Sequence, residues 1–93
     1  MVYAVDIDGT ICLESEHWWE YDKALPIASA IEKVNNLFLD GHTIILFSAR
    51  FHCDEKVTMD WLKEQGVRYH MLVLGKVKAD VYIDNASLRM EEL

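Results

Sequence analysis

Proline and glycine are scarce in this sequence, with one proline and four glycines among 93 residues. A chain so poor in both is neither collagen-like nor dominated by flexible linkers. Hydrophobic residues make up 52% of the chain, enough to bury a core, which excludes a disordered protein. The length corresponds to one domain, and we expect residues 1–93 to fold as a single unit.

Long apolar runs are also absent, and no stretch approaches the roughly 18–20 residues that a membrane span needs. No basic segment followed by an apolar one opens the chain, so we expect neither a signal peptide nor a membrane partner. Cysteine occurs twice, at Cys12 and Cys53, which is no disulfide framework and favours the reducing cytoplasm. A zinc site formed with His17 and His52 is conceivable, but the ligand spacings are not the usual ones.

Basic residues are few: nine lysines and arginines stand against sixteen acids, for a net charge of −7. General binding to nucleic-acid backbones is therefore not expected, because such binding needs a basic surface. A nucleotide or a nucleic-acid end remains allowed as a substrate if a cation mediates the contact.

Hydrophobic patterning predicts alternating strands and helices. The expected strands are Val2–Asp6, Thr43–Phe47, Tyr69–Leu74 and Val81–Ile83. The expected helices begin at Pro26 and at Asp54, end near Gly41 and Gly66, and are followed by a short terminal helix at Ser87–Leu93. Between the first strand and the first helix, the segment Gly9–Leu25 has no clear period and predicts a long loop or irregular hairpin, which we call the flap.

This order predicts an α/β fold with a mostly parallel sheet of about four strands. The connection Gly75–Asp80 is short for a parallel crossover, so the direction of the fourth strand stays open. No room exists for a large cap domain.

Polar side chains follow the ends of the four expected strands. They are Asp6, Asp8, Ser48, Arg50, Lys76 and Asp84. Each alone is an ordinary turn or surface residue, but parallel strands bring their carboxyl ends to one edge, where ligands bind. Asp6 and Asp8 flank one apolar residue and would repel each other unless a cation or a proton lies between them.

The segment Asp6-Ile7-Asp8-Gly9-Thr10, preceded by an apolar strand, resembles the first motif of the haloacid dehalogenase-like hydrolases. Ser48, Lys76 and Asp84 match the later motifs in order, so the resemblance covers essentially the whole chain. It is most similar to small capless phosphatases linked to capsule or polysaccharide biosynthesis and to phage proteins. Two departures are Val77, where relatives tend to have proline, and Asn85, where they often have a second aspartate.

The resemblance implies a three-layer, Rossmann-like fold and a Mg²⁺-dependent phosphomonoester hydrolase. Asp6 would be the nucleophile that forms an aspartyl-phosphate, and Asp8 the general acid and base. Asp6, the Asp8 carbonyl and Asp84 would bind Mg²⁺. Lys76 would balance negative charge, and Ser48 would donate to phosphate oxygens.

Further residues receive supporting roles. The phosphate-binding loops would contain Gly9, Thr10, Ala49 and Arg50, although Arg50 is equally expected to pair with a surface acid. Asn85 would orient a metal-bound water. In the flap, Trp18, Trp19 and Tyr21 are candidates for stacking on the leaving group, for flap packing or for an oligomer contact. Lys78 is a rival for Lys76, and Asp80 for Asp84.

Other functions stay open. A response-regulator receiver is disfavoured, because its phospho-acceptor aspartate ends the third strand, where this chain has Gly75-Lys76. A degenerate relative kept for binding, and a phosphotransferase, are the remaining alternatives. The expected partner is a small phosphate ester, whether sugar phosphate, nucleotide or phosphorylated end. An open, capless site also suggests a homo-oligomer.

Overall fold

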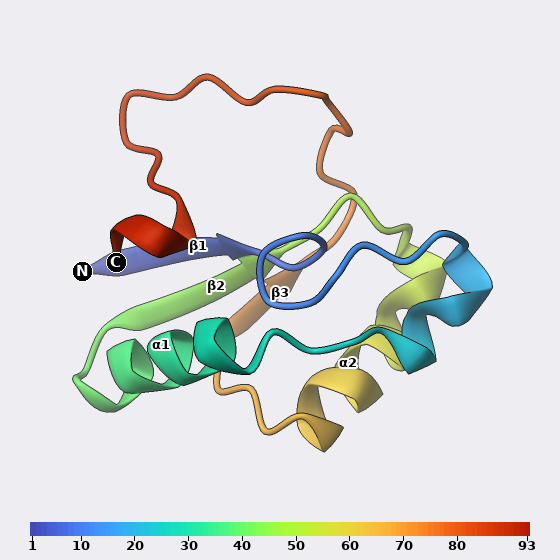
Figure 1. Ribbon diagram of the computed structural model, residues 1–93, viewed down its shortest axis with the longest axis horizontal. Coiled ribbons are helices and arrows are strands. Elements are labelled where there is room, and N and C mark those ends of the chain that lie inside the picture. The colour runs from blue at the N-terminus through green and yellow to red at the C-terminus, as the bar shows by residue number, and fades with distance from the viewer.

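The computed structural model describes residues 1–93 as a small α/β fold with one parallel sheet. Strands β1 (Val2–Asp6), β2 (Thr43–Phe47) and β3 (Met71–Val73) lie in the order β1-β2-β3 (Figure 1). Helices α1 (Ala28–Leu39) and α2 (Glu55–Glu64) connect them in turn. Three short 3-10 turns complete the chain: η1 (Trp18–Lys23), η2 (His52–Asp54) and η3 (Met90–Glu92). The predicted α/β class with a parallel sheet and no large cap is confirmed.

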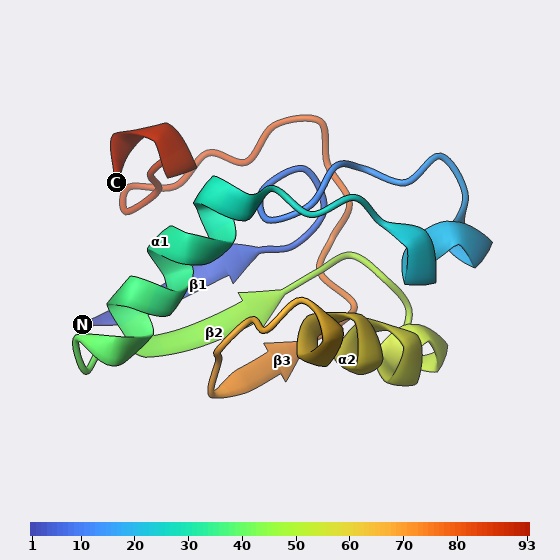
Figure 2. The same cartoon turned by 60° about the horizontal axis from the view of Figure 1, so that its bottom comes forward.

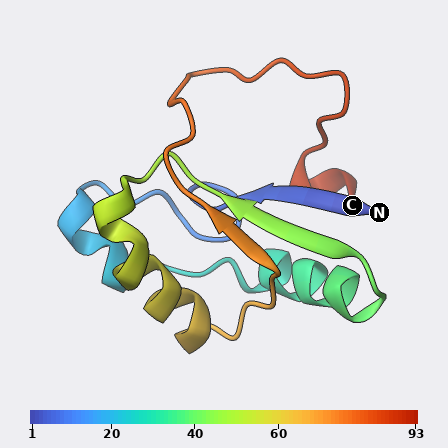
Figure 3. The ribbon, with the colours of Figure 1, turned by 180° about the vertical axis from the view of Figure 1, so that it is seen from behind.

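Helices α1 and α2 cover the same face of the sheet, and neither covers the other face (Figures 2 and 3). Because side chains alternate along a strand, Val5, Ile44 and Leu46 turn to the helices and are buried. On the opposite face, Met71 is 54% exposed and Val73 is 44% exposed. The structure therefore has two layers, and one face of its sheet is apolar and open.

The sequence predicted that the first helix begins at Pro26, but α1 begins two residues later, at Ala28. Pro26 forms a bridge with Cys12, and the Ile27 N–H donates to the carbonyl of Ile11, so these residues are held extended against the first loop. The end of α1 agrees with the prediction. Gly41 follows it with φ +92°, a left-handed conformation that suits glycine, and its N–H donates to the carbonyl of Phe38.

Helix α2 follows Asp54, which occupies the predicted capping position. Its carboxylate, however, accepts from the N–H of Phe51 and so stabilises η2. The buried residues of α2 are Thr58, Trp61 and Leu62. Trp61 donates its indole N–H to the carbonyl of Ala24 at 2.9 Å, which attaches the end of the flap to the helix.

The flap, residues 9–25, is the predicted long loop with η1 inside it. Its base is closed where the Leu13 N–H donates to the carbonyl of Leu25 at 2.9 Å. No helix of the structure has the length and apolar character to span a membrane.

The expected fourth strand is absent from this structure, where residues 77–89 form a loop that leaves the sheet (Figure 1). A strand needs a hydrogen-bonded neighbour, and the main chain of residues 81–83 has none in this structure. The Tyr82 hydroxyl donates to the carbonyl of Val77 and accepts from the N–H of Ala79. Ile83 is 96% exposed, and β1 remains an edge strand. The expected terminal helix is reduced to η3, which Lys33 of α1 contacts through the carbonyl of Met90.

Candidate functional site at the carboxyl edge of the sheet

The loops that follow the three strands are joined by main-chain hydrogen bonds. The Ile7 N–H donates to the carbonyl of Phe47 at 3.2 Å, and the Ser48 N–H donates to that of Val73 at 3.0 Å. Lys76 returns across the edge, with its N–H donating to the carbonyl of Ser48 at 2.9 Å. The segments with the predicted site residues therefore meet at one edge, apart from the segment that contains Asp84.

Asp8 is the centre of the best-defined cluster. Its Oδ2 accepts from Ser48 Oγ at 3.1 Å and from Arg50 Nε at 3.1 Å. Its Oδ1 accepts from Arg50 Nη2 at 2.8 Å, which completes a bidentate ion pair. The thiol of Cys12 lies 3.8 Å from the same oxygen. The structure thus brings together three of the predicted residues, and it pairs Arg50 with a half-buried acid rather than a surface one.

Arg50 is enclosed on every side, with 0% of its side chain exposed. Its Nη1 donates to Thr58 Oγ1 of α2 at 3.0 Å, and the ring of Tyr21 covers the guanidinium, 3.8 Å from its carbon to the ring centroid. A guanidinium fits this environment because it bonds a carboxylate with two parallel N–H groups and stacks on aromatic rings. Sequence reasoning missed Thr58, although its place one turn before the apolar Trp61 was a signal of burial.

Asp6 and Lys76 form a second, looser charge pair. Burial raises the pKa of the Asp6 carboxyl above its ordinary 3.8, and the positive charge of Lys76 and a hydrogen bond from the Ile7 N–H oppose this. The two groups are more than 4 Å apart, since the ion pairs of the chain are Arg50–Asp8 and Lys56–Asp60. Each of the two carboxylates in the first loop therefore has its own cation nearby.

The first loop turns tightly between the two carboxylates and the flap. Gly9 adopts φ +81°, which other residues rarely adopt, and its N–H donates to the carbonyl of Cys12 at 2.8 Å. Gly9 is exposed, whereas Thr10 and Ala49 are half-buried. These three predicted phosphate-loop residues stand in the same loops as Asp8 and Ser48.

Asp84 and Asn85 are not brought to this edge. Both are exposed, and Asp84 Oδ1 accepts from the N–H of Ala86 in a local turn at 3.0 Å. The rivals Lys78 and Asp80 are exposed in the same loop. No group of three or more histidine, cysteine, aspartate or glutamate side chains is placed to hold a metal ion. The conceivable zinc site is therefore not assembled, and neither is the expected Mg²⁺ site.

The flap aromatics separate into two sets. Tyr21 covers Arg50, as described, whereas Trp18 is 63% exposed and Trp19 is 60% exposed. Trp19 stacks on His17 with ring centroids 4.3 Å apart, and Trp18 meets Trp19 edge-on. The two tryptophans are thus available for a contact with another molecule, and Tyr21 belongs to the Asp8–Arg50 cluster.

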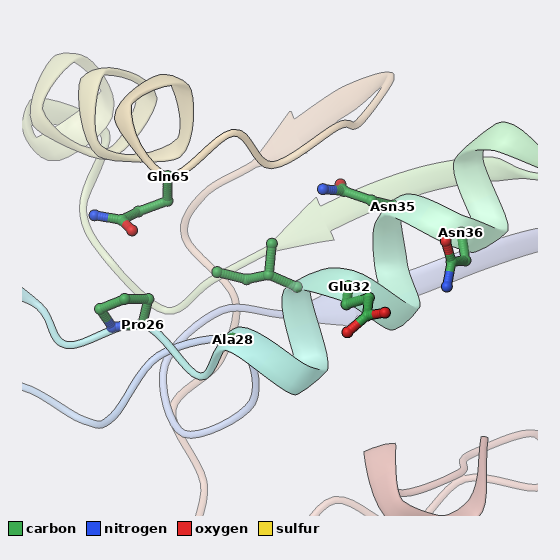
Figure 4. A pocket seen from close by; sticks show the side chains of 7 residues that line it. Pro26, Ala28, Glu32, Asn35, Asn36 and Gln65 are labelled. Carbon is green, nitrogen blue, oxygen red and sulfur yellow. The ribbon is translucent and has the colours of Figure 1, made fainter.

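A hollow of about 330 Å³ lies elsewhere, between α1 and the residue after α2 (Figure 4). Its lining includes Glu32, Asn36 and Gln65, and none of the strand-end residues. Asn35 lines the hollow, but its side-chain amide already donates to the carbonyl of Gly66 and accepts from the N–H of Arg68. This hollow has no charge pair or nucleophile, so the sheet edge remains the candidate site.

The fold is similar to that of several solved structures, two of which are described here. A target protein from Vibrio cholerae is 24% identical and has a TM-score of 0.84, with 98% of this chain and 85% of that one covered. A chain of the Pnkp1/Rnl/Hen1 complex is 21% identical and has a TM-score of 0.71, with 85% of this chain covered but only 30% of that one. No family model matches the chain, and no curated protein does. At these identities the likeness concerns the fold alone.

Proposed function

We propose that this protein is a phosphomonoester hydrolase of the haloacid dehalogenase-like type, with Asp6 as the nucleophile. The observation that carries the proposal is the meeting of Asp6, Lys76, Asp8 and Ser48 at the carboxyl edge of a parallel sheet. This edge is where α/β proteins bind ligands. A nucleophilic carboxylate, a lysine and a hydroxyl donor are the groups that phosphoryl transfer needs.

In the proposed reaction, a carboxylate oxygen of Asp6 forms a bond to phosphorus as the ester P–O bond breaks. Asp8 gives a proton to the leaving alcohol and later takes one from the water that hydrolyses the aspartyl-phosphate. Lys76 offsets negative charge on Asp6 and the phosphate. Asp8 now accepts bonds from Ser48 and Arg50. To transfer a proton, Asp8 must give up at least one of these hydrogen bonds and bond the leaving group instead.

Magnesium dependence is a separate proposal, because the residues as they lie do not fit the ion. Asp8 is engaged by Arg50, and Asp84 is exposed in its own turn. A hard cation prefers several oxygen ligands in an octahedron, which Asp6 alone does not provide. We propose that Mg²⁺ binds when residues 81–83 pair with the free edge of β1 and bring Asp84 to Asp6. That pairing would also supply the fourth strand of a Rossmann-like sheet.

The test is phosphate release from a panel of sugar phosphates, nucleotides and phosphorylated oligonucleotide ends, with Mg²⁺ and with a chelator. We expect turnover by the wild type and a loss of at least about a thousandfold in Asp6→Asn, because no other group can form the covalent intermediate. Asp40→Asn, an exposed change after α1, is the matched control. A folded wild type that releases phosphate from no ester would overturn the proposal.

A non-catalytic binding protein is the second candidate, and two observations favour it. Asp8 already has an internal cation, and Asp84 stands apart from the other residues. Binding of inorganic phosphate without turnover of any ester would identify this alternative. A phosphotransferase, which would pass the phosphoryl group to an alcohol in place of water, would be revealed by a phosphorylated acceptor.

The exposed surface supports two further proposals. Trp18 and Trp19 are placed to stack on a sugar or base of the leaving group, or on a second copy of the chain. Both cysteines are unpaired. A reducing compartment such as the cytoplasm suits this state, and we propose that location.

A further inference from the structure

The ammonium of Lys76 lies between two aromatic rings. Its Nζ is 3.6 Å from the ring centroid of Tyr82 and 4.1 Å from that of Phe47. Neither ion pair of the chain includes Lys76. The charge is therefore held by ring faces and is not paired with a carboxylate of the chain. We call Phe47, Lys76 and Tyr82 the lysine clamp.

The clamp stands directly beside the proposed nucleophile. Phe47 ends β2 and is the register partner of Asp6, which ends β1. In a parallel sheet such partners point to the same face, so the Phe47 ring that contacts Lys76 is the strand neighbour of the Asp6 side chain. From this position the positive charge of Lys76 lowers the pKa of the Asp6 carboxyl, against the effect of burial.

A ring face restrains a cation differently from a carboxylate. A cation over an aromatic ring is attracted by its quadrupole, but its charge is not cancelled. A carboxylate at the same place would restrain the lysine and also neutralise it, which would make it useless to a phosphate. Two rings can thus fix a long, mobile side chain while leaving its full charge available.

We propose that Tyr82 is a positioning residue that, in the metal-free arrangement of the loop described above, holds Lys76 beside Asp6 to receive a phosphate group. This rests on the proposed function for its catalytic consequence, but the clamp can be measured without turnover. The Tyr82 hydroxyl has a separate task, because its bonds to the main chain of Val77 and Ala79 shape the loop. The ring and the hydroxyl can therefore be removed one at a time.

The experiment compares the wild type with Tyr82→Phe, which keeps the ring, and Tyr82→Leu, which removes it. The first readout is the NMR shift of the Lys76 ε-methylene protons, which ring currents move upfield when they lie over aromatic faces. We expect Tyr82→Phe to keep most of the upfield shift and Tyr82→Leu to lose about half, since Phe47 remains. Leu88→Ala, a change at an exposed residue of the same loop, is the control and should keep the whole shift.

The second readout is the affinity for inorganic phosphate, measured with a chelator present so that the loop keeps this arrangement. Tyr82→Leu should weaken phosphate binding about three- to tenfold, as expected for one cation–ring contact, and Tyr82→Phe should bind within about twofold of the wild type. Equal urea midpoints for the variants would show that all of them are folded.

The outcomes separate the two proposals. An unchanged Lys76 shift or unchanged phosphate affinity in Tyr82→Leu would overturn the clamp, and so would a Tyr82→Phe variant as impaired as Tyr82→Leu. A clamp that behaves as expected in a protein that turns over no ester would support the positioning role while the hydrolase proposal fails.

Discussion

The guanidinium of Arg50 donates two hydrogen bonds to the carboxylate of Asp8, at 2.8 Å from Nη2 and 3.1 Å from Nε. The arginine comes from the loop after β2, and the aspartate from the loop after β1. The pair joins these two loops, and Thr58 and Tyr21 enclose it from α2 and from the flap. It is therefore a structural connection as well as a part of the candidate site, and its removal should affect both.

Replacing Arg50 with methionine should destabilise the protein by about 2–4 kcal/mol. The change leaves Asp8, whose side chain is 20% exposed, without its cation, and removal of one partner from a largely buried pair is costly. For a domain with a total stability of roughly 5–10 kcal/mol this is a large fraction. Urea denaturation followed by far-UV circular dichroism measures the free energy of unfolding.

The surface pair of Lys56 with Asp60 provides the control for this experiment. It has a similar distance, 2.7 Å, but its side chains are 88% and 64% exposed. Lys56→Met should leave stability almost unchanged, because water screens an exposed pair. The Arg50–Asp8 pair would not be a structural connection if Arg50→Met behaved like Lys56→Met.

The stability of Asp6→Asn, compared with that of the wild type at the same pH, should increase as the pH rises. Burial raises the folded-state pKa of Asp6 above 3.8, so its favourable contribution is complete below that pH and is lost as pH rises through the folded value. Near pH 7 the wild type bears the cost of a partly buried charge, which the amide does not have. We expect the unfolding free energy of wild type minus variant to fall as the pH rises above 3.8 and through the raised folded-state pKa.

Lys76→Met tests the cause assigned to this shift. Its charge lowers the pKa of Asp6, so its removal should steepen the pH dependence of stability that Asp6 contributes. A difference between wild type and Asp6→Asn that does not change with pH would show that Asp6 has an ordinary pKa in the folded protein.

The two cysteines should react with thiol reagents at very different rates. Cys12 is fully buried, and burial together with the charge of Asp8 raises its pKa to about 11, whereas Cys53 is exposed. The thiolate is the reactive form, so Cys12 should be inert in the folded state. Titration with a chromogenic disulfide should show one fast equivalent and a second only in denaturant. Cys53→Ser should lose the fast one, and two fast equivalents would contradict the burial of Cys12.

Mg²⁺ should protect the loop 77–89 if Asp84 joins the site on metal binding. Lys78 and Arg89 in this loop are sites for trypsin, and the loop is exposed without the ion. We expect Mg²⁺ to slow cleavage at both sites in the wild type and in Asp80→Asn, but not in Asp84→Asn, since a ligand that binds one state shifts the equilibrium toward it. Mass spectrometry of the fragments identifies the sites. Equal protection in Asp84→Asn would exclude Asp84 as a ligand.

Local patterning predicted the elements whose signals are themselves local. Strands Val2–Asp6 and Thr43–Phe47 have the predicted bounds, because apolar β-branched runs with turn residues at their ends mark buried strands. The prediction for Val81–Ile83 rested on the same kind of run, but pairing also needs a neighbour. Residues 81–83 lie away from the edge of β1 in this structure, and their main chain pairs with no strand.

The sequence by itself determined the parallel α/β arrangement and the gathering of strand-end residues, since periodicity and chain order constrain which ends meet. Only the tertiary structure decided which basic side chain lies beside which carboxylate. Arg50 pairs with Asp8, and Lys76 lies near Asp6 between two rings. Such pairings depend on distances of a few ångströms between segments about 40 or more residues apart, because electrostatic and hydrogen-bond energies change steeply over that range. Spacing along the chain does not encode those distances.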